Sequence, residues 1–272
     1  MPKAIHATKR APRKKQAAAL VPALTRGAAI LDFIAESKQP VTAQQIADAL
    51  DLPKSSAHNL CATLLELNLI FRKADQTYTI GPHVMRWANV FQQRSDVAAE
   101  FANIWDESTG LPGATIALSV RDGAEIVYVA TRNSGRTPGM NFRIGMRLPA
   151  AFTATGKALL SHLPDARIAE LFENGFPKPL TRYSVQTLER LMTDVRKYRK
   201  DGYSIDNQET SEGMICFGSA VLDSGNHPIA AIAVSIPASD PILKNRDTVI
   251  AGVKDFAGRI SRRLGATLEE PQ

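Results

Sequence analysis

The pattern of apolar and polar positions divides the chain into a helical first part and a mixed second part. Residues 24–36 and 41–70 place apolar side chains at three- and four-residue intervals, which is the period of one helix face. From Ala114 onward, runs of β-branched and apolar residues alternate with turn signals and with further helical segments. Strand pairs separated by helices predict an α+β fold for this second part.

Residues 41–70 predict two short helices joined by a tight turn. Thr42 and Gln45 have the spacing of a capping box at the start of the first helix. The turn at 51–53 ends that helix, and residues 53–56 begin the second with a serine that is able to cap it. A preceding helix over 24–36 completes a three-helix unit, and its predicted packing face carries Leu24, Ala28, Leu31, Ile34 and Ala35.

The second helix of this pair has an apolar face and a polar face, which is the layout of a helix-turn-helix that binds DNA. The polar side chains of its first turns are Lys54, Ser55, Ser56, His58 and Asn59. Residues 70–73 and 77–81 then predict a small β-hairpin. It is either an ordinary edge hairpin or the wing of a winged helix, and its position directly after the helix pair favours the wing, with Arg72 and Lys73 beside the DNA backbone.

The rest of the chain predicts a linker helix over 82–94 and then a separate domain. The Asp122-Gly123 turn joins strands at 115–120 and 125–131, and a second hairpin joins 215–222 to 229–236. Further strands are predicted at 142–148 and 203–207, and helices at 96–109, 153–163, 164–173, 185–200 and 244–264.

Charge is distributed unevenly along the chain. The net charge is +6, from 33 basic and 27 acidic residues, and residues 1–31 hold seven of the basic residues and no acid. The remaining chain is therefore nearly neutral, and residues 25–90 contain six basic and six acidic residues. The basic arm at 1–22 predicts a disordered segment that attracts phosphates; a solubilising tail is the alternative.

Composition also bears on location and chemistry. Two cysteines far apart in sequence indicate a reducing cytosol, and no apolar run approaches the roughly 18–20 residues of a membrane span. No secretion signal is evident. We therefore predict a cytoplasmic protein that does not enter a membrane.

No motif favours an enzyme. Gly156-Lys157 lacks the other residues of a phosphate-binding loop, and no G-x-G-x-x-G or G-x-S-x-G occurs. The five histidines are scattered, and Cys216 lies in an apolar strand, where a buried structural thiol is expected. We predict no catalytic residue, no metal and no cofactor, although catalytic residues can also assemble from distant positions.

Residues 148–157 predict a strand that leads into a helix, and the first turn of this helix consists of small residues, several with hydroxyl groups. Free backbone N–H groups beside hydroxyls suit a small carboxylate. A merely well-capped helix explains the same pattern equally well.

Three blocks of sequence resemble the IclR family of bacterial transcriptional regulators. The first runs from LTRGAAILDFIAES to YTIGP and is similar to the family's winged-helix domain. The second, IGMRLPAAFTATGKALLSHLP, is close to its G-x-x-x-P-x-x-x-T-A-x-G-K-A-x-L-A signature, and the third begins GYSIDNQETSEGMICFGSA. Together they cover nearly the whole chain after the arm.

The resemblance implies a GAF-like domain that binds a small organic acid, with aromatic acids among the candidates, and homo-dimers or homo-tetramers. Family effector positions fall on Leu148, Ala154, Thr155, Asp206, Cys216 and Ser235. The sequence departs from the family pattern at several positions, and Ser219-Ala220 stands where Ala-Pro is usual. Ala233 replaces a position that is often serine, and Asn59 stands where the family commonly has arginine after the histidine, which favours adenine over guanine.

We therefore predict an arm (1–22), a winged helix-turn-helix (23–81), a linker helix (82–95), an effector-binding domain (96–266) and a tail (267–272). The expected function is ligand-responsive regulation of a catabolic operon by binding double-stranded DNA at a pseudo-palindromic operator. One alternative is an enzyme acting on a small molecule in the second domain. Another is a winged helix that binds a protein partner.

Overall fold

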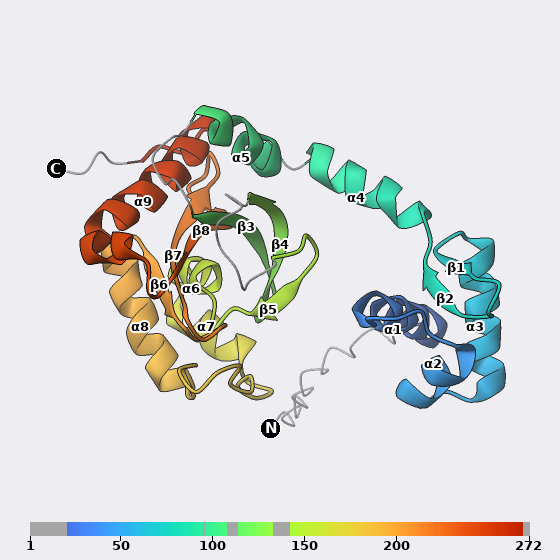
Figure 1. The fold of residues 1–272 in the computed structure, drawn as a ribbon. Coiled ribbons are helices and arrows are strands. Elements are labelled where there is room, and N and C mark those ends of the chain that lie inside the picture. Colours follow the sequence, from blue (N-terminus) through green and yellow to red (C-terminus); the bar gives the residue numbers. More distant parts are fainter. Residues whose placement is uncertain (1–20, 95, 108–113, 133–141, 269–272) are drawn as a thin grey trace, which may run out of the picture. The chain divides into compact units, whose positions relative to one another are not determined.

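A computed structural model describes residues 21–94, 96–107, 114–132 and 142–268. The chain divides after Asn89 into two compact units (Figure 1). The predicted arm lies almost entirely outside the described residues. No helix in the described part of the chain is long and apolar enough to cross a membrane.

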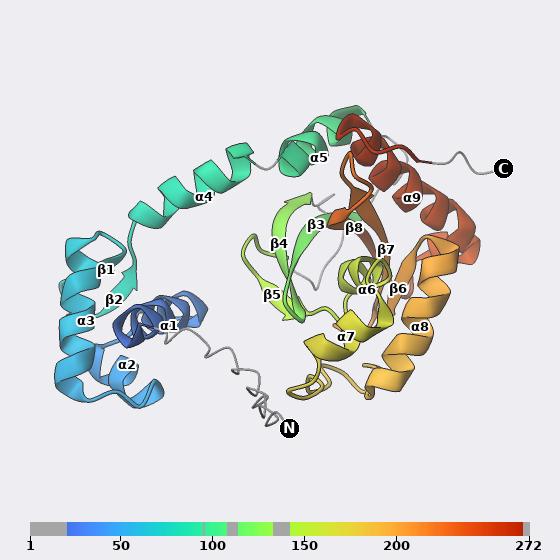
Figure 2. The ribbon, with the colours of Figure 1, turned by 180° about the vertical axis from the view of Figure 1, so that it is seen from behind.

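The first unit is a three-helix bundle followed by a hairpin. Its elements are α1 (Pro22–Glu36), α2 (Ala43–Ala49), α3 (Lys54–Glu66), β1 (Ile70–Arg72) and β2 (Tyr78–Ile80). The two strands pair antiparallel, with Ile70 opposite Ile80, and follow directly on α3 (Figure 2). Ile30, Ile46 and Cys61 are fully buried at the centre of the unit, so one side chain from each helix fixes the bundle.

Local signals at the helix starts were only partly predictive. The capping box of α2 is confirmed, because Thr42 accepts from the Gln45 N–H and the Gln45 side chain accepts from the Thr42 N–H. The predicted serine cap of α3 is wrong: Pro53 is the N-cap residue, and no side chain in the described part of the chain caps the helix. The serines fall inside the first turn because the proline, with its fixed φ, already occupies the cap position.

The predicted packing face of α1 was wrong at most of its positions. Of its five residues only Ile34 is buried: Leu24 is 74% exposed, Ala28 and Ala35 are also exposed, and Leu31 is half-buried. The buried residues of the helix are Gly27, Ile30 and Ile34. Leu24 lies one turn before the first buried position, so it extends past the part of α1 that packs. The predicted linker helix is present as α4 (His83–Arg94).

The second unit is built on one antiparallel sheet in the order β5-β4-β3-β8-β7-β6. The strands are β3 (Thr115–Asp122), β4 (Glu125–Arg132), β5 (Arg147–Pro149), β6 (Ser204–Asn207), β7 (Met214–Leu222) and β8 (Pro228–Pro237). The helices are α5 (Asp96–Glu107), α6 (Ala154–Leu160), α7 (Asp165–Leu171), α8 (Leu188–Asp201) and α9 (Arg246–Arg263), with a 3-10 turn, η1 (Pro241–Asn245).

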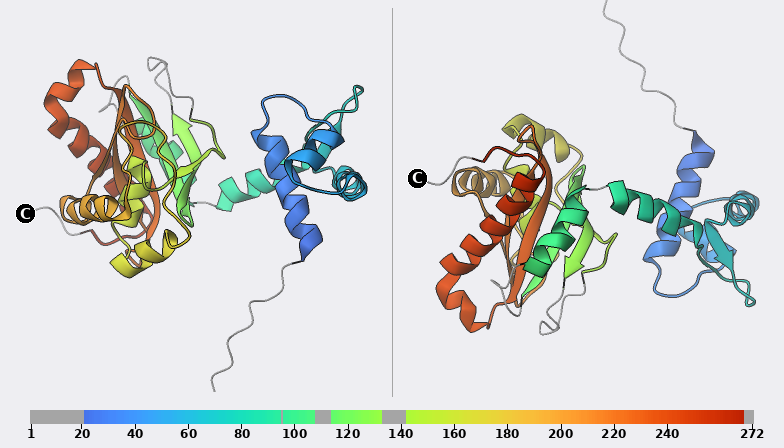
Figure 3. Two further views of the ribbon diagram at one scale, coloured as in Figure 1. Left: turned by 90° about the horizontal axis from the view of Figure 1, so that it is seen from below. Right: turned by 90° about the horizontal axis from the view of Figure 1, so that it is seen from above.

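Each face of this sheet has its own core. Helices α5 and α9 lie side by side on one face (Figure 3), where Phe101 and Phe256 meet edge to face with ring centroids 5.8 Å apart. Helix α6 lies in the hollow of the other face (Figure 1), which also carries the core shared with α7 and α8. This arrangement sandwiches the sheet between two helical layers.

Helix α6 approaches the sheet closely because the strands beneath it carry small residues. A Cβ added at Gly218 would lie 2.7 Å from the carbonyl of Ala154, so only glycine fits there. The Ser204 hydroxyl donates to the same carbonyl at 2.5 Å. The start of α6 is thereby fixed against β6 and β7.

Several predicted boundaries in this unit shift. The strand predicted at 142–148 is present only as β5, because Gly145 at φ 85° makes a turn there. Helix α8 begins at Leu188, after Thr187 caps it by accepting from the Arg190 N–H. The helix predicted at 244–264 begins only at Arg246, because its first two positions belong to η1. Gly202 ends α8 in the left-handed region, as expected.

Candidate DNA interface and effector site

Helix α3 presents a polar face to solvent. Lys54, Ser55, His58 and Asn59 are exposed and Ser56 is half-buried. The opposite face is buried through Ala57, Cys61 and Leu64. The structure thus places all five predicted contact residues on or beside one face of the helix.

Sequence reasoning missed the continuation of this face. Ala62 and Thr63 are exposed one turn further along, and the Thr63 hydroxyl donates to the Asn59 carbonyl at 3.0 Å. This bond uses the backbone carbonyl of Asn59 and not its side-chain amide. The helical repeat alone could have identified both residues.

The hairpin after α3 carries the two predicted phosphate contacts. Arg72, at the end of β1, and Lys73, in the turn, are both exposed. The turn is closed by the Lys73 N–H, which donates to the Thr77 carbonyl at 2.8 Å. The tip also holds Asp75, whose pKa is lowered by the hydrogen bond from the Thr77 hydroxyl, so this hairpin carries a negative charge beside its cations.

In the second unit, β-sheet register brings predicted effector positions from three strands together. Cys216 on β7 lies opposite Asp206 on β6 and opposite Ser235 on β8. The Ser235 hydroxyl donates to the Cys216 sulfur at 3.2 Å. Ala154, at the start of α6, packs with Cys216 and Ala233. We call Ala154, Asp206, Cys216 and Ser235 the effector cluster.

The effector cluster is a buried polar site with little nucleophilic character. Burial raises the pKa of the Cys216 thiol well above its ordinary value, and the neighbouring Asp206 carboxylate raises it further. Burial likewise raises the pKa of Asp206, although the Thr210 hydroxyl and the N–H groups of Glu209 and Thr210 donate to it. A neutral thiol is a poor nucleophile, so the cluster suits binding better than covalent chemistry.

Thr155 provides a polar group that no protein atom among the described residues satisfies. Its side chain is in the first turn of α6, the residue is 1% exposed, and the hydroxyl has no hydrogen-bond partner there. The Ser119 hydroxyl, on the same sheet face as Ala117 and Ala231, is also buried without a partner in this part of the chain. Thr153 does cap α6, accepting from the Gly156 N–H at 3.0 Å, so a well-capped helix and an unsatisfied hydroxyl occur together.

Leu148 lies apart from the effector cluster. It belongs to β5, opposite Ile126 of β4, and β5 and β6 are the two edge strands of the sheet. Leu148 packs against the core beneath α6. It therefore shares the sheet face of the cluster without joining its hydrogen-bonded centre.

A buried ion pair beside the cluster was not predicted. The Lys157 ammonium, fully buried on α6, donates to the Glu209 carboxylate and to the Ile205 carbonyl, the latter at 3.1 Å. Burial raises the pKa of Glu209, and the charge of Lys157 opposes that rise. Lys157 and Glu209 fall within two of the family-like blocks, which was the available signal, but nothing in their spacing indicated contact.

Metal chemistry has no support in the described part of the chain. No group of three or more His, Cys, Asp or Glu side chains there is placed to hold a metal ion. What the geometry offers is an exposed helical face with a cationic hairpin, and a buried polar cluster in a separate unit.

Comparison with known proteins identifies this combination. The family model described as "IclR helix-turn-helix domain" matches residues 23–73. The model described as "Bacterial transcriptional regulator IclR C-terminal" matches residues 91–262. The chain belongs to the IclR family. It is thus a DNA-binding transcriptional regulator, with a winged helix-turn-helix and a GAF-like α+β domain, and the enzyme interpretation is discarded because the curated relatives are named repressors.

Similar IclR-family proteins span nearly the whole chain. The crystal structure of the Agobacterium tumefaciens repressor BlcR is 42% identical, covers 91% of this chain and 99% of its own, and has a TM-score of 0.61. The transcriptional repressor AllR of Salmonella typhi is 27% identical over 248 residues, covering 89% of this chain and 90% of AllR. An IclR homolog from Microbacterium hydrocarbonoxydans, solved in complex with 4-hydroxybenzoate, shares the fold at 16% identity, with a TM-score of 0.72 and coverage of 89% and 99%.

Proposed function

We propose that this IclR-family regulator is a cytoplasmic sensor of a small organic acid that controls a catabolic operon. Binding of the acid at the effector cluster changes how the protein occupies a pseudo-palindromic operator. The observation that carries the effector half of this proposal is the Thr155 hydroxyl, which is buried beside the cluster and lacks a partner among the described residues.

An unpartnered buried hydroxyl costs stability in the free protein, and that cost is removed when a ligand atom bonds to it. Besides Thr155, the Ser235 hydroxyl and the protonated Cys216 thiol offer polar groups to the ligand, while Ala154 and Ala233 leave room by their small size. Leu148 is on the same sheet face but on the opposite edge strand, so it adds an apolar contact for an acid long enough to extend across the sheet. Such a mixture of a few polar groups and apolar walls suits a small organic acid.

The effector cluster offers little positive charge to balance that of an acid. Lys157 is already engaged by Glu209, and Asp206 is itself acidic. An acid bound here is therefore held mainly by hydroxyls and apolar contact, which favours aromatic or extended acids with a dispersed charge over a bare dianion. The homolog that binds 4-hydroxybenzoate supports this class.

On the DNA side, we propose that Ser55, Ser56, His58 and Asn59 contact base edges. Lys54, Arg72 and Lys73 then contact phosphates. The near-neutral charge of residues 25–90 makes one copy a weak binder. A homo-dimer, or a homo-tetramer built from dimers, places two α3 helices in successive major grooves, ~34 Å apart on the operator, and the basic arm adds affinity that is independent of sequence.

Ligand binding has to be transmitted from one unit to the other, and α4 is the segment that joins them. We propose that the ligand has different affinities for two arrangements of the paired DNA-binding units and shifts the population between them. By linkage, operator DNA then changes the affinity for the ligand by the same factor.

Two measurements test the proposed function. Selection of bound duplexes from a random-sequence library should yield a two-fold symmetric site, and a library without enriched symmetry would contradict the dimeric readout. A panel of small organic acids that includes 4-hydroxybenzoate should then contain compounds that raise the unfolding temperature and change affinity for that site. If stabilising compounds leave operator affinity unchanged, the sensing role is refuted even though DNA binding stands.

A further inference from the structure

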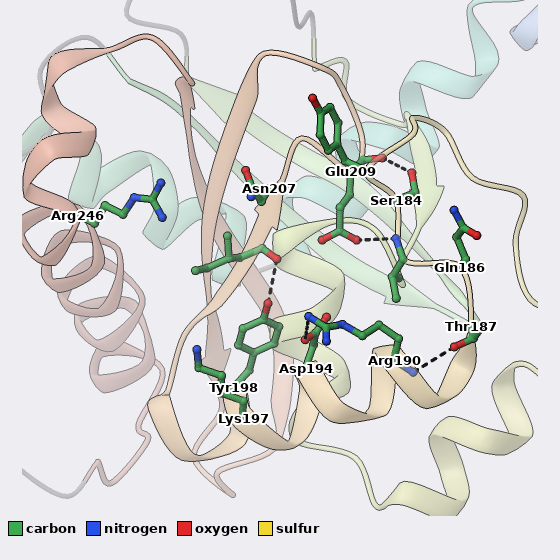
Figure 4. Close-up of a pocket in the computed structure, with 13 residues that line it drawn as sticks. Ser184, Gln186, Thr187, Arg190, Asp194, Lys197, Tyr198, Asn207, Glu209 and Arg246 are labelled. Atoms are coloured by element: carbon green, nitrogen blue, oxygen red, sulfur yellow. Dashed lines mark hydrogen bonds and ion pairs between the residues drawn. The ribbon is translucent and has the colours of Figure 1, made fainter.

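The second unit contains a cavity outside the effector cluster, and its lining is rich in cations. The cavity has a volume of about 600 Å³ and lies between α8, the loop before it, β6 and the start of α9 (Figure 4). We call it the outer cavity. The charged side chains that line it are Arg190, Asp194, Lys197, Glu209 and Arg246.

Positive charge predominates in the outer cavity. Arg190 forms an ion pair with Asp194, with their nitrogen and oxygen 3.5 Å apart. The charge of Glu209 is balanced by its ion pair with Lys157. Lys197 and Arg246 have no hydrogen-bond or ion-pair partner within the described residues. Figure 4 shows them on two different helices, with Lys197 on α8 and Arg246 apart from it at the start of α9, and both line the outer cavity.

The position of Arg246 is not explained by the stability of its helix. It is the first residue of α9, where the helix dipole disfavours a positive charge. An anion in the outer cavity would remove that penalty. The remaining lining suits a small polar molecule, with Gln186, Thr187 and Asn207 as hydrogen-bonding groups and with Val185 and Ile205 as apolar contacts.

We propose that the outer cavity is a second ligand site, for a small anion that carries at least two anionic oxygens, as in a phosphate group or a dicarboxylate. Lys197 from α8 binds one anionic oxygen, and Arg246 from α9 binds another. This site is separate from the effector cluster, and its occupancy does not depend on the identity of the proposed effector.

The strand β6 and its extension form a common wall between the two sites. Ile205, Asn207 and Glu209 line the outer cavity, whereas Asp206 between them belongs to the effector cluster. Glu209 also fixes the loop before α8, since its carboxylate accepts from the Val185 N–H at 3.2 Å and its carbonyl accepts from the Ser184 hydroxyl at 2.6 Å. An anion in the outer cavity is therefore in a position to shift the same strand that the effector contacts.

The test is calorimetric titration of the full-length protein with inorganic phosphate and, separately, with malonate. The variant Lys197→Gln/Arg246→Gln removes the two cavity cations that have no partner within the described residues and leaves Arg190 with Asp194. The variant Lys200→Gln/Lys244→Gln is the matched control, because it removes the same charge from α8 and from η1 just before α9 at exposed positions outside the cavity. Urea unfolding of each variant verifies that it folds.

We expect saturable binding of at least one probe to the native chain. In the cavity variant the affinity should fall about 100-fold, because two charge-assisted hydrogen bonds are missing. In the control variant the affinity should change little. The tighter probe identifies the chemical class of the ligand. Equal weakening in both variants would show unspecific charge attraction, and absence of binding by both probes would overturn the site. If neither probe binds and the cavity variant changes the oligomeric state by sedimentation, the surface is a subunit contact instead.

Discussion

Lys157 and Glu209 form an ion pair inside the second unit although they are 52 residues apart in sequence. The lysine side chain is 0% exposed and the glutamate side chain 10% exposed. Because Lys157 also donates to the Ile205 carbonyl and Glu209 accepts from the Val185 N–H, the pair joins α6 to β6 and to the loop before α8. It connects the effector cluster to the outer cavity.

Removing one partner of this pair should be costly. We expect Glu209→Gln to lower the free energy of unfolding by about 3 kcal/mol, because it leaves the Lys157 charge buried without its partner. The double variant Lys157→Met/Glu209→Gln should be destabilised much less than the sum of the single variants, as measured by urea denaturation. The exposed Arg167–Glu170 pair is the control, where Glu170→Gln should change stability by less than about 1 kcal/mol. Additive effects at Lys157 and Glu209 would show that the pair is not coupled.

The sequence predicted the elements of this fold well where the signal is local. The capping box at Thr42 and Gln45, the Asp122-Gly123 turn and the glycine that closes α8 each depend on residues that are neighbours in the chain. Such signals need no knowledge of the tertiary structure. The family-like blocks extended this success to the order of the domains.

Prediction failed where packing between distant segments decides the outcome. The exposure of Leu24 depends on how far α1 extends beyond its neighbours, and the contact of Lys157 with Glu209 depends on α6 lying against β6. The outer cavity draws its cations from two helices that are far apart in sequence. No periodicity within one segment carries that information, so these features required coordinates.

The Thr155 hydroxyl, which has no partner among the described residues, predicts opposite effects on stability and on binding. Thr155→Val keeps the shape of the side chain and removes the buried hydroxyl, so the ligand-free protein should gain roughly 1 kcal/mol in its free energy of unfolding. The same variant should bind an effector acid found in the panel about tenfold more weakly by calorimetry. Ser235→Ala should also weaken binding but without the gain in stability, because its hydroxyl already bonds to Cys216. Unchanged affinity in both variants would remove these residues from the ligand site.

The basic arm should contribute affinity without specificity. Deleting residues 1–20 is expected to weaken operator binding and to reduce the steepness of its salt dependence, by about 0.9 in the log–log slope for each phosphate that the arm no longer neutralises. An arm of unchanged length with glutamine at its six basic positions, Lys3, Lys9, Arg10, Arg13, Lys14 and Lys15, should behave like the deletion. Binding titrations over a range of salt concentrations test both variants. A salt slope equal to that of the full chain would exclude this role for the arm.

Asn59 should set a base preference on the exposed face of α3. Asparagine pairs with adenine through two hydrogen bonds, whereas arginine pairs with guanine, so Asn59→Arg should move the preference at one position of each half-site from adenine to guanine. Duplex selection with each protein measures the change. Thr63→Ser, which preserves a hydroxyl able to bond to the Asn59 carbonyl, is the control and should leave the selected site unaltered. A new preference that appears at several positions at once would point to a changed docking angle and not to direct readout by Asn59.

The buried acids of the second unit should give a distinctive pH dependence of stability. Burial raises the pKa values of Asp206 and Glu209, so the folded protein retains protons that the unfolded chain has released. Both groups therefore make folding less favourable as the pH rises from the unfolded carboxyl pKa, about 4, through the raised folded value.

Asp206→Asn cannot titrate and should flatten this decline in urea denaturation measured at successive pH values. Asp165 is the contrasting control, because the hydrogen bond from Arg196 lowers its pKa and the stability it contributes is lost as the pH falls. Asp165→Asn should thus weaken the protein mainly at neutral pH, the opposite pattern. If the free energy of unfolding of Asp206→Asn falls with pH as steeply as that of the native chain, the pKa of Asp206 is not raised in the folded protein.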